Sequence, residues 1–278
     1  MVARSLFTGL VDDAALFPPG NAPMARALAE HAGHRSAPYA DLVGPFLCPA
    51  SRVDELVAAL PADQDIRLAI VFDVPGDAAH SALRTSAGDP RLSLEAVEAA
   101  HEGLGEDAAA VGANLARLPA ATGYLEVPGG GFEAGLDLVA SSGWHAAKYR
   151  TGGTAADAFP SEVELAAFLV AATTRDLSFK LTAGLHHAVR STDEGTGFEQ
   201  HGVLNVLVAT RVAQQRADLT EVAAVLAQRQ PRPLMEFVQV WDDSTSADVR
   251  HAFRSFGCCG VTDPIDDLAV LGLLGDAT

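Results

Sequence analysis

Short runs of β-branched and aromatic residues alternate along this chain with longer runs rich in Ala, Leu and Glu. The alternation is typical of parallel βα units, because each helix carries the chain back to the edge where the next parallel strand begins. We predict strands at 42–48, 66–74, 123–127, 144–149 and 178–182, while 92–97 fits either a strand or the start of a helix. This recurrence predicts an α/β fold, a (β/α) TIM-type barrel in which residues 1–278 form a single domain.

The last third of the chain has a different pattern. After Gly197 it predicts helices at 202–215 and 219–228, a strand at 235–241, and two further helices, from Ser246 and from Asp263-Pro264. Proline in a first helical turn with an aspartate before it is a strong start signal, since it fixes φ and satisfies free amide groups. We therefore expect a helix-rich C-terminal third and irregular or degenerate last units of the barrel.

The composition limits the partners. A formal net charge of -17 and a pI near 4.7 repel phosphate backbones and anionic lipids, so we expect neither nucleic acid nor a membrane as a partner. Two of the three cysteines are adjacent, at Cys258 and Cys259, which does not make a disulfide framework and indicates a reducing compartment. No apolar run approaches the roughly 20 residues that span a bilayer. We predict a cytoplasmic protein, and the sequence leaves a homo-oligomer open.

Charged side chains end several of the predicted strands. Because side chains alternate along a strand, the residues between the apolar positions of 66–74, 123–127, 144–149 and 178–182 point into the barrel. This rule places four charged residues inward, at or near the C-terminal strand ends where barrel enzymes carry their chemistry: Asp73, Glu126, Lys148 and Lys180. The two lysine strands are predicted to be the fifth and sixth.

A lysine in a buried strand needs a partner or a use for its amine, since removing an ammonium from water is expensive. An amine is a nucleophile only without its proton, and a neighbouring cation or a dry pocket lowers its pKa. Lys148 and Lys180 on adjacent strands would supply the nucleophile and the neighbouring charge. Glu126 or Asp73 would then move protons during imine formation and carbon–carbon bond cleavage.

The lysine pair also resembles a known family. Lys148 begins the pattern Lys-x-x-Thr-Gly, and Lys180 begins the pattern Lys-x-x-x-Gly thirty-two positions later. Over residues 145–185 this is similar to the paired lysine strands of the deoxyribose-phosphate aldolase family. The resemblance implies that Lys148 forms a Schiff base with a small-molecule carbonyl substrate and that Lys180 lowers its pKa. The expected function is therefore a lyase of class I aldolase type.

Several residues near the lysines are expected to bind the substrate. Arg150 can grip an anionic group, and the amides of Gly152 and Gly153 can cradle one. His186 and His187, just beyond the second lysine strand, can orient a carboxylate. No cofactor is predicted.

Two other functions stay open. In the first, Asp73, Glu126 and a histidine from His186-His187 bind a metal in an isomerase or hydrolase. In the second, the barrel is non-catalytic and binds a metabolite or a protein partner, and the lysines form a structural ion network with the carboxylates. The segment 12–20 fits either a lid over the barrel mouth or an arm that plugs one barrel end.

Overall fold

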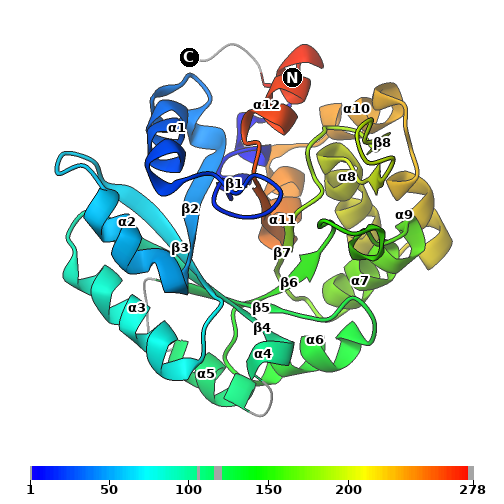
Figure 1. The fold of residues 1–278 in the computed structure, drawn as a ribbon. Coiled ribbons are helices and arrows are strands. Elements are labelled where there is room, and N and C mark those ends of the chain that lie inside the picture. The colour runs from blue at the N-terminus through cyan, green and yellow to red at the C-terminus, as the bar shows by residue number, and fades with distance from the viewer. Residues whose placement is uncertain (1, 105–106, 116–120, 275–278) are drawn as a thin grey trace.

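Eight parallel strands close into a barrel in the computed structural model, which describes residues 2–104, 107–115 and 121–274 (Figure 1). The strands are β1 (Val11–Asp13), β2 (Val43–Pro49), β3 (Ile66–Phe72), β4 (Leu92–Ala100), β5 (Thr122–Glu126), β6 (Ala146–Arg150), β7 (Phe179–Thr182) and β10 (Phe253–Cys258). They pair in the order β1-β10-β7-β6-β5-β4-β3-β2, and β2 closes the ring against β1. The predicted TIM-type barrel is confirmed.

Helices surround the strands as an outer ring (Figure 1). They are α1 (Met24–Ser36), α2 (Val53–Ala59), α3 (Gly76–Gly88), α4 (His101–Leu104), α5 (Ala108–Leu115), α6 (Phe132–Ser141), α7 (Glu162–Thr174), α8 (Val203–Gln214), α9 (Leu219–Leu226), α10 (Pro231–Gln239), α11 (Asp243–Ala252) and α12 (Thr262–Val270). Short 3-10 turns lie at Arg4–Leu6, Ala40–Leu42, Ala50–Arg52 and Ala156–Ala158. Among the described residues, no helix combines the length and the apolar character that crossing a bilayer requires.

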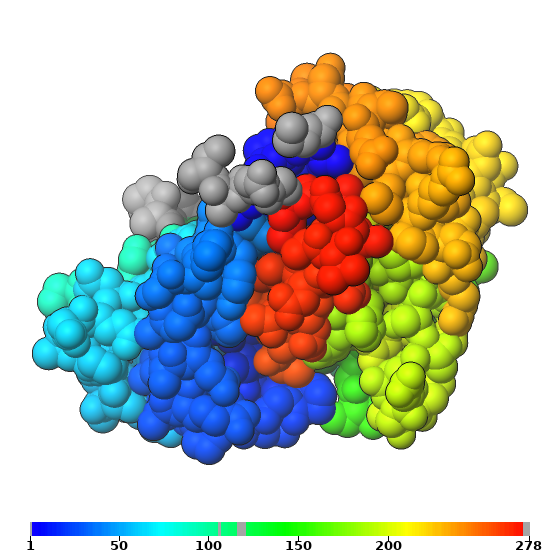
Figure 2. All heavy atoms as spheres, turned by 90° about the horizontal axis from the view of Figure 1, so that it is seen from above, coloured from blue at the N-terminus to red at the C-terminus, as the bar shows by residue number. Residues whose placement is uncertain are grey.

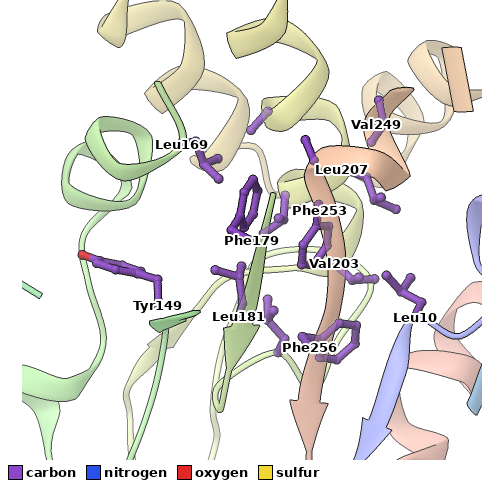
Figure 3. Close-up of a cluster of buried hydrophobic side chains, with 14 of the residues drawn as sticks. Leu10, Tyr149, Leu169, Phe179, Leu181, Val203, Leu207, Val249, Phe253 and Phe256 are labelled. Carbon is purple, nitrogen blue, oxygen red and sulfur yellow. The ribbon is translucent and has the colours of Figure 1, made fainter. Parts of the chain in front are cut away.

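The main hydrophobic core lies between the strands and this ring of helices. Figure 3 shows Tyr149 of β6, Phe179 and Leu181 of β7 and Phe253 of β10 among side chains of the covering helices. Phe179 and Phe253 stack with ring centroids 5.5 Å apart. The outward faces of β6 and β7 are thus apolar, and the alternation of the strands directs the intervening side chains into the barrel.

The C-terminal third is helix-rich, as predicted, with α8 to α11 between β7 and the last barrel strand, β10. A small two-stranded sheet of β8 (Ser191–Thr192) and β9 (Glu199–Gln200) precedes these helices. The strand predicted at 235–241 is wrong, because most of that segment belongs to α10. Pro231 opens this helix, and Leu234 and Val238 are buried four positions apart, which is a helical period.

The first and last barrel strands were not predicted. β1 has only three residues, too few to show an alternating pattern, and β10 follows directly on α11 without the turn that would mark its start. The lysine strands are consequently β6 and β7, the sixth and seventh along the chain, and not the fifth and sixth. Arg4 donates a 2.8 Å hydrogen bond to the carbonyl of Leu274, and Figure 2 shows the blue N-terminal segment beside the red C-terminal one.

A lysine and carboxylate layer beneath the C-terminal pocket

Five charged side chains meet inside the barrel, each from a different strand. They are Asp12 of β1, Glu98 of β4, Glu126 of β5, Lys148 of β6 and Lys180 of β7. The strand register brings them together, because Lys148 is the direct neighbour of both Glu126 and Lys180. The two lysines are the only lysines among the 19 Lys and Arg residues of the chain. Both of them therefore lie in this layer.

Glu98 joins the two lysines. Its Oε2 lies 2.7 Å from Nζ of Lys148, and its Oε1 accepts a short hydrogen bond from Nζ of Lys180. Glu98 is completely buried. It was missed in the sequence because the predicted strand 92–97 ends one residue before it. The alternation itself contains the signal, since Val97 and Ala99 on either side belong to the outer hydrophobic core.

Lys148 and Glu126 form the upper part of the layer. Their Nζ and Oε2 atoms are 3.0 Å apart, and Arg150 contacts the other oxygen of Glu126 at 2.9 Å. The side chain of Lys148 is 5% exposed and that of Arg150 is 48% exposed. The amine of Lys148 is therefore nearly dry, while the guanidinium reaches solvent.

Lys180 and Asp12 form the lower part. Nζ of Lys180 lies 2.6 Å from Oδ2 of Asp12, which also accepts a 2.7 Å hydrogen bond from Ser255. The ring of Tyr124 lies 5.2 Å from the same ammonium. A Cβ on Gly44 of β2 would come within 2.0 Å of Oδ1 of Asp12, so a residue without a side chain is required there.

The electrostatics of the layer differ from the prediction. Burial lowers the pKa of Lys148, but the contacts with Glu98 and Glu126 raise it more than burial and Lys180 lower it, and the net direction is upward from 10.5. The pKa of Lys180 is likewise raised, because Asp12 and Glu98 outweigh its burial. Lys180 does lower the pKa of Lys148, as predicted, but the carboxylates outweigh this effect, and the predicted net suppression of protonation is wrong. The ammonium form is favoured for both amines.

The carboxylates show the reciprocal effect. Burial raises the pKa of Glu98, but the two ammonium groups beside it lower it to about 2. The pKa of Glu126 is also lowered, since Lys148 and Arg150 outweigh its burial. The group is balanced: three carboxylates, Asp12, Glu98 and Glu126, face three cations, Lys148, Lys180 and Arg150.

A pocket of about 430 Å³ opens above this layer at the C-terminal ends of the strands. Of the predicted site residues, Glu126, Lys148, Arg150, Gly153 and His186 line it. Phe17, Pro18 and Pro19 cover one side, so the segment that begins with β1 contributes Asp12 to the layer and apolar side chains to the pocket wall. A pocket at this end of the barrel is where TIM-barrel enzymes carry their active sites.

Lys180 reaches a different cavity. It lines a space of about 650 Å³ at the N-terminal ends of the strands, together with Asp12, Tyr124, Arg250 and Arg254. The polar layer therefore separates two cavities, with Lys148 on the upper side and Lys180 on the lower side. This division decides which lysine can meet a ligand in the C-terminal pocket.

Three predicted site residues lie elsewhere. Asp73 follows the end of β3 and accepts hydrogen bonds from the amide and the hydroxyl of Ser51, the first at 2.9 Å, so it belongs to a loop and not to the barrel interior. His187 is directed to Asp267 of α12, at 3.1 Å, and away from the pocket. The backbone of Gly152 packs on Gly184, where a Cβ would meet its Cα at 2.6 Å. Close backbone approach, not ligand binding, accounts for that glycine.

The donor set of the metal-dependent alternative does not assemble. Asp73 faces Ser51, while His186 contacts Asp263 at 2.9 Å and not Glu126. In the part of the chain that the structure describes, no three His, Cys, Asp or Glu side chains are grouped to hold a metal ion.

Fold and site together define a (β/α) barrel with a buried lysine and carboxylate layer beneath its C-terminal pocket. The chain matches no protein-family model, no curated protein and no solved structure.

Proposed function

We propose that this barrel forms an imine between Lys148 and a small carbonyl compound, as a lyase of class I aldolase type. One observation carries the proposal: Lys148 is a nearly dry amine that lines the C-terminal pocket within 3.0 Å of Glu126. A pocket of about 430 Å³ suits a small molecule. The likeness of the lysine pair to the deoxyribose-phosphate aldolase family supports the same assignment.

The charge of the layer favours the imine product. Lys148 reacts from its ammonium form, and the reaction of an ammonium with a carbonyl gives a protonated imine and one water molecule. The cation is conserved, so Glu98 and Glu126 stabilise the protonated imine as they stabilise the ammonium. The contacts that raise the pKa of Lys148 therefore disfavour only the neutral amine, which is transient.

Glu126 is the base that releases this neutral amine. It takes the proton from Nζ of Lys148 at 3.0 Å, and the amine then attacks the carbonyl carbon. The carbonyl oxygen takes one proton from the attacking nitrogen and one back from Glu126, and it leaves as water while the nitrogen forms the protonated imine. Glu98 is also within reach of Lys148, but it does not line the pocket and it is shared with Lys180.

The protonated imine then acts as an electron sink. In a β-hydroxy carbonyl substrate, a base removes the hydroxyl proton, the carbon–carbon bond breaks, and its electron pair moves into the imine to give an enamine. Glu126 is assigned this second proton transfer because it is the carboxylate that faces the pocket.

Reductive trapping tests the proposal directly. Incubation with small aldehydes and ketones and borohydride should add the mass of the carbonyl fragment at Lys148. The chain suits the experiment, because Lys148, Lys180 and the α-amine are the only amines in it that can form imines. The matched variant is Lys148→Arg, which keeps a cation between Glu98 and Glu126 but should show no adduct there.

The pH dependence tests the role of Glu126. Transfer of the proton from Lys148 to Glu126 leaves the total number of protons unchanged, so trapping by wild type should be nearly constant between about pH 6 and 9. In Glu126→Gln the carboxylate that faces the pocket is lost, and Glu98, at 2.7 Å from Lys148, is shared with Lys180, so trapping should slow by at least about tenfold. Trapping by Glu126→Gln at the wild-type rate would contradict this assignment, and so would a wild-type rate that rises about tenfold per pH unit.

Other outcomes would favour a different function. Adducts confined to the α-amine, or equal trapping by Lys148→Arg, would overturn the imine proposal. The layer would then be a structural ion network in a binding barrel.

A further inference from the structure

A second group of reactive side chains borders the same pocket. Nε2 of His186 lies 3.8 Å from Sγ of Cys259, and Nδ1 of His186 lies 2.9 Å from Oδ2 of Asp263. His186 follows β7, Cys259 follows β10 and Asp263 belongs to α12. Three elements thus bring together a thiol, an imidazole and a carboxylate in the order nucleophile, base and orienting group.

His186 is held as a cation. Its hydrogen bond with Asp263 raises its pKa above 6.5, the two neighbouring cysteine sulfurs add to the effect, and partial burial opposes it. Nδ1 donates to Asp263, which leaves the Nε2 proton for the sulfur of Cys259. A positive imidazole beside a sulfur stabilises the thiolate, the nucleophilic form.

The other two cysteines do not reach the pocket, although Sγ of Cys258 also lies 3.7 Å from Nδ1 of His186. Burial raises the pKa of Cys48 to about 12, and burial also raises the pKa of Cys258. Neither of them lines the C-terminal pocket, whereas Cys259 does and is partly exposed. The chain therefore contains its own controls for thiol reactivity.

We propose that Cys259 is a second nucleophile of this pocket, activated by His186 and oriented through it by Asp263, and that it takes a small aldehyde. The Cys259 sulfur forms a bond to the carbonyl carbon, and the π electron pair of the C=O bond moves to the oxygen. Cys259 had released its proton to Nε2 of His186. The oxygen takes this proton, and a hemithioacetal results. The addition of the thiol to the aldehyde conserves all atoms and electrons and requires no further reactant.

The proposal does not depend on an imine at Lys148. The charged groups that face the thiol are His186, backed by Asp263, on its own side of the pocket and Glu126, Lys148 and Arg150 on the pocket wall formed by β5 and β6. The last three are already paired among themselves. His186 is therefore the cation left to act on the sulfur.

Alkylation measures the activation. At pH 6.5 an ordinary thiol of pKa about 8.5 is only about 1% thiolate. Iodoacetamide should therefore label Cys259 at least about tenfold faster than N-acetylcysteine at this pH. Cys48 and Cys258 should stay unlabelled, as peptide mapping would show. The variant Cys258→Ser should keep the fast reaction.

His186→Gln and Asp263→Asn separate activation from access. In both variants the labelling rate should fall to that of the free thiol. Labelling of wild-type Cys259 at or below the free-thiol rate, or an unchanged rate in His186→Gln, would overturn the proposal.

The ligand is tested in Lys148→Arg, where no imine can form in the pocket. Acetaldehyde should slow the alkylation of Cys259 there at least about threefold at a concentration that leaves N-acetylcysteine labelling unchanged. Absence of protection would overturn the aldehyde assignment. A failure to trap any imine in wild type would leave these rates unaffected, so the two proposals fail separately.

Discussion

Glu98→Gln removes one negative charge from the centre of the barrel while it keeps the shape of the side chain. Glu98 is fully buried and contacts both ammonium groups. Its pKa of about 2, against an ordinary 4.5, corresponds to about 3 kcal/mol of stability at neutral pH, at about 1.4 kcal/mol per pKa unit. Removing one partner of a buried ion pair costs about 3 to 5 kcal/mol, which agrees.

The sign of the pH dependence follows from the direction of the shift. The pKa of Glu98 is lower in the folded protein than in the unfolded chain, so the contribution is fully present above pH 4.5 and is lost as the pH falls toward 2. The difference between wild type and Glu98→Gln should be about 3 kcal/mol at pH 7 and about 1 kcal/mol near pH 3.

Urea unfolding followed by circular dichroism gives these free energies. Glu236→Gln is the matched control, because Glu236 is 59% exposed and pairs with Arg232 on the surface of α10, and it should change little. Glu98→Gln as stable as wild type at pH 7 would refute the reasoning. So would a difference that does not shrink between pH 5 and pH 3.

Two further variants test the surroundings of the site by the same unfolding measurement. Gly152→Ala should destabilise the protein by about 2 kcal/mol, because its Cβ would meet the backbone of Gly184 at 2.6 Å. Gly129→Ala, whose Cβ would have no atom of the described residues within 4 Å, should change little. Equal stabilities would contradict the close approach. Asp73→Ala should lose about 1 kcal/mol with its hydrogen bonds from Ser51 and should leave reductive trapping at wild-type level. A loss of trapping would contradict the placement of Asp73 outside the site.

The alternation of side chains predicted part of the site because the strands that contain it are regular. Glu126, Lys148 and Lys180 each lie between apolar outward neighbours, and the structure places all three inside the barrel. The same rule was wrong for Asp73, since β3 ends at Phe72 and alternation has no meaning beyond the strand end. A pattern of period two locates a side chain only within a strand whose ends are known.

The remaining partners are fixed by contacts between distant segments, which sequence patterns do not contain. Asp12 lies in a three-residue strand and meets Lys180 across 168 positions. His186 meets Cys259 and Asp263 across 73 and 77 positions. The closure of the barrel by β1 and β10 brings these residues together, and neither strand has a recognisable pattern of its own.

The closure of the barrel also gives the two lysines different surroundings. Lys180 is held between Asp12 and Glu98 over the ring of Tyr124, and it faces the cavity at the N-terminal ends of the strands. It therefore cannot meet a carbonyl compound bound in the C-terminal pocket. It lowers the pKa of Lys148 directly, and it also contacts Glu98, whose two oxygens reach the two amines. Lys180 is thus one contact removed from the pocket: it holds the carboxylate that in turn contacts the amine of Lys148.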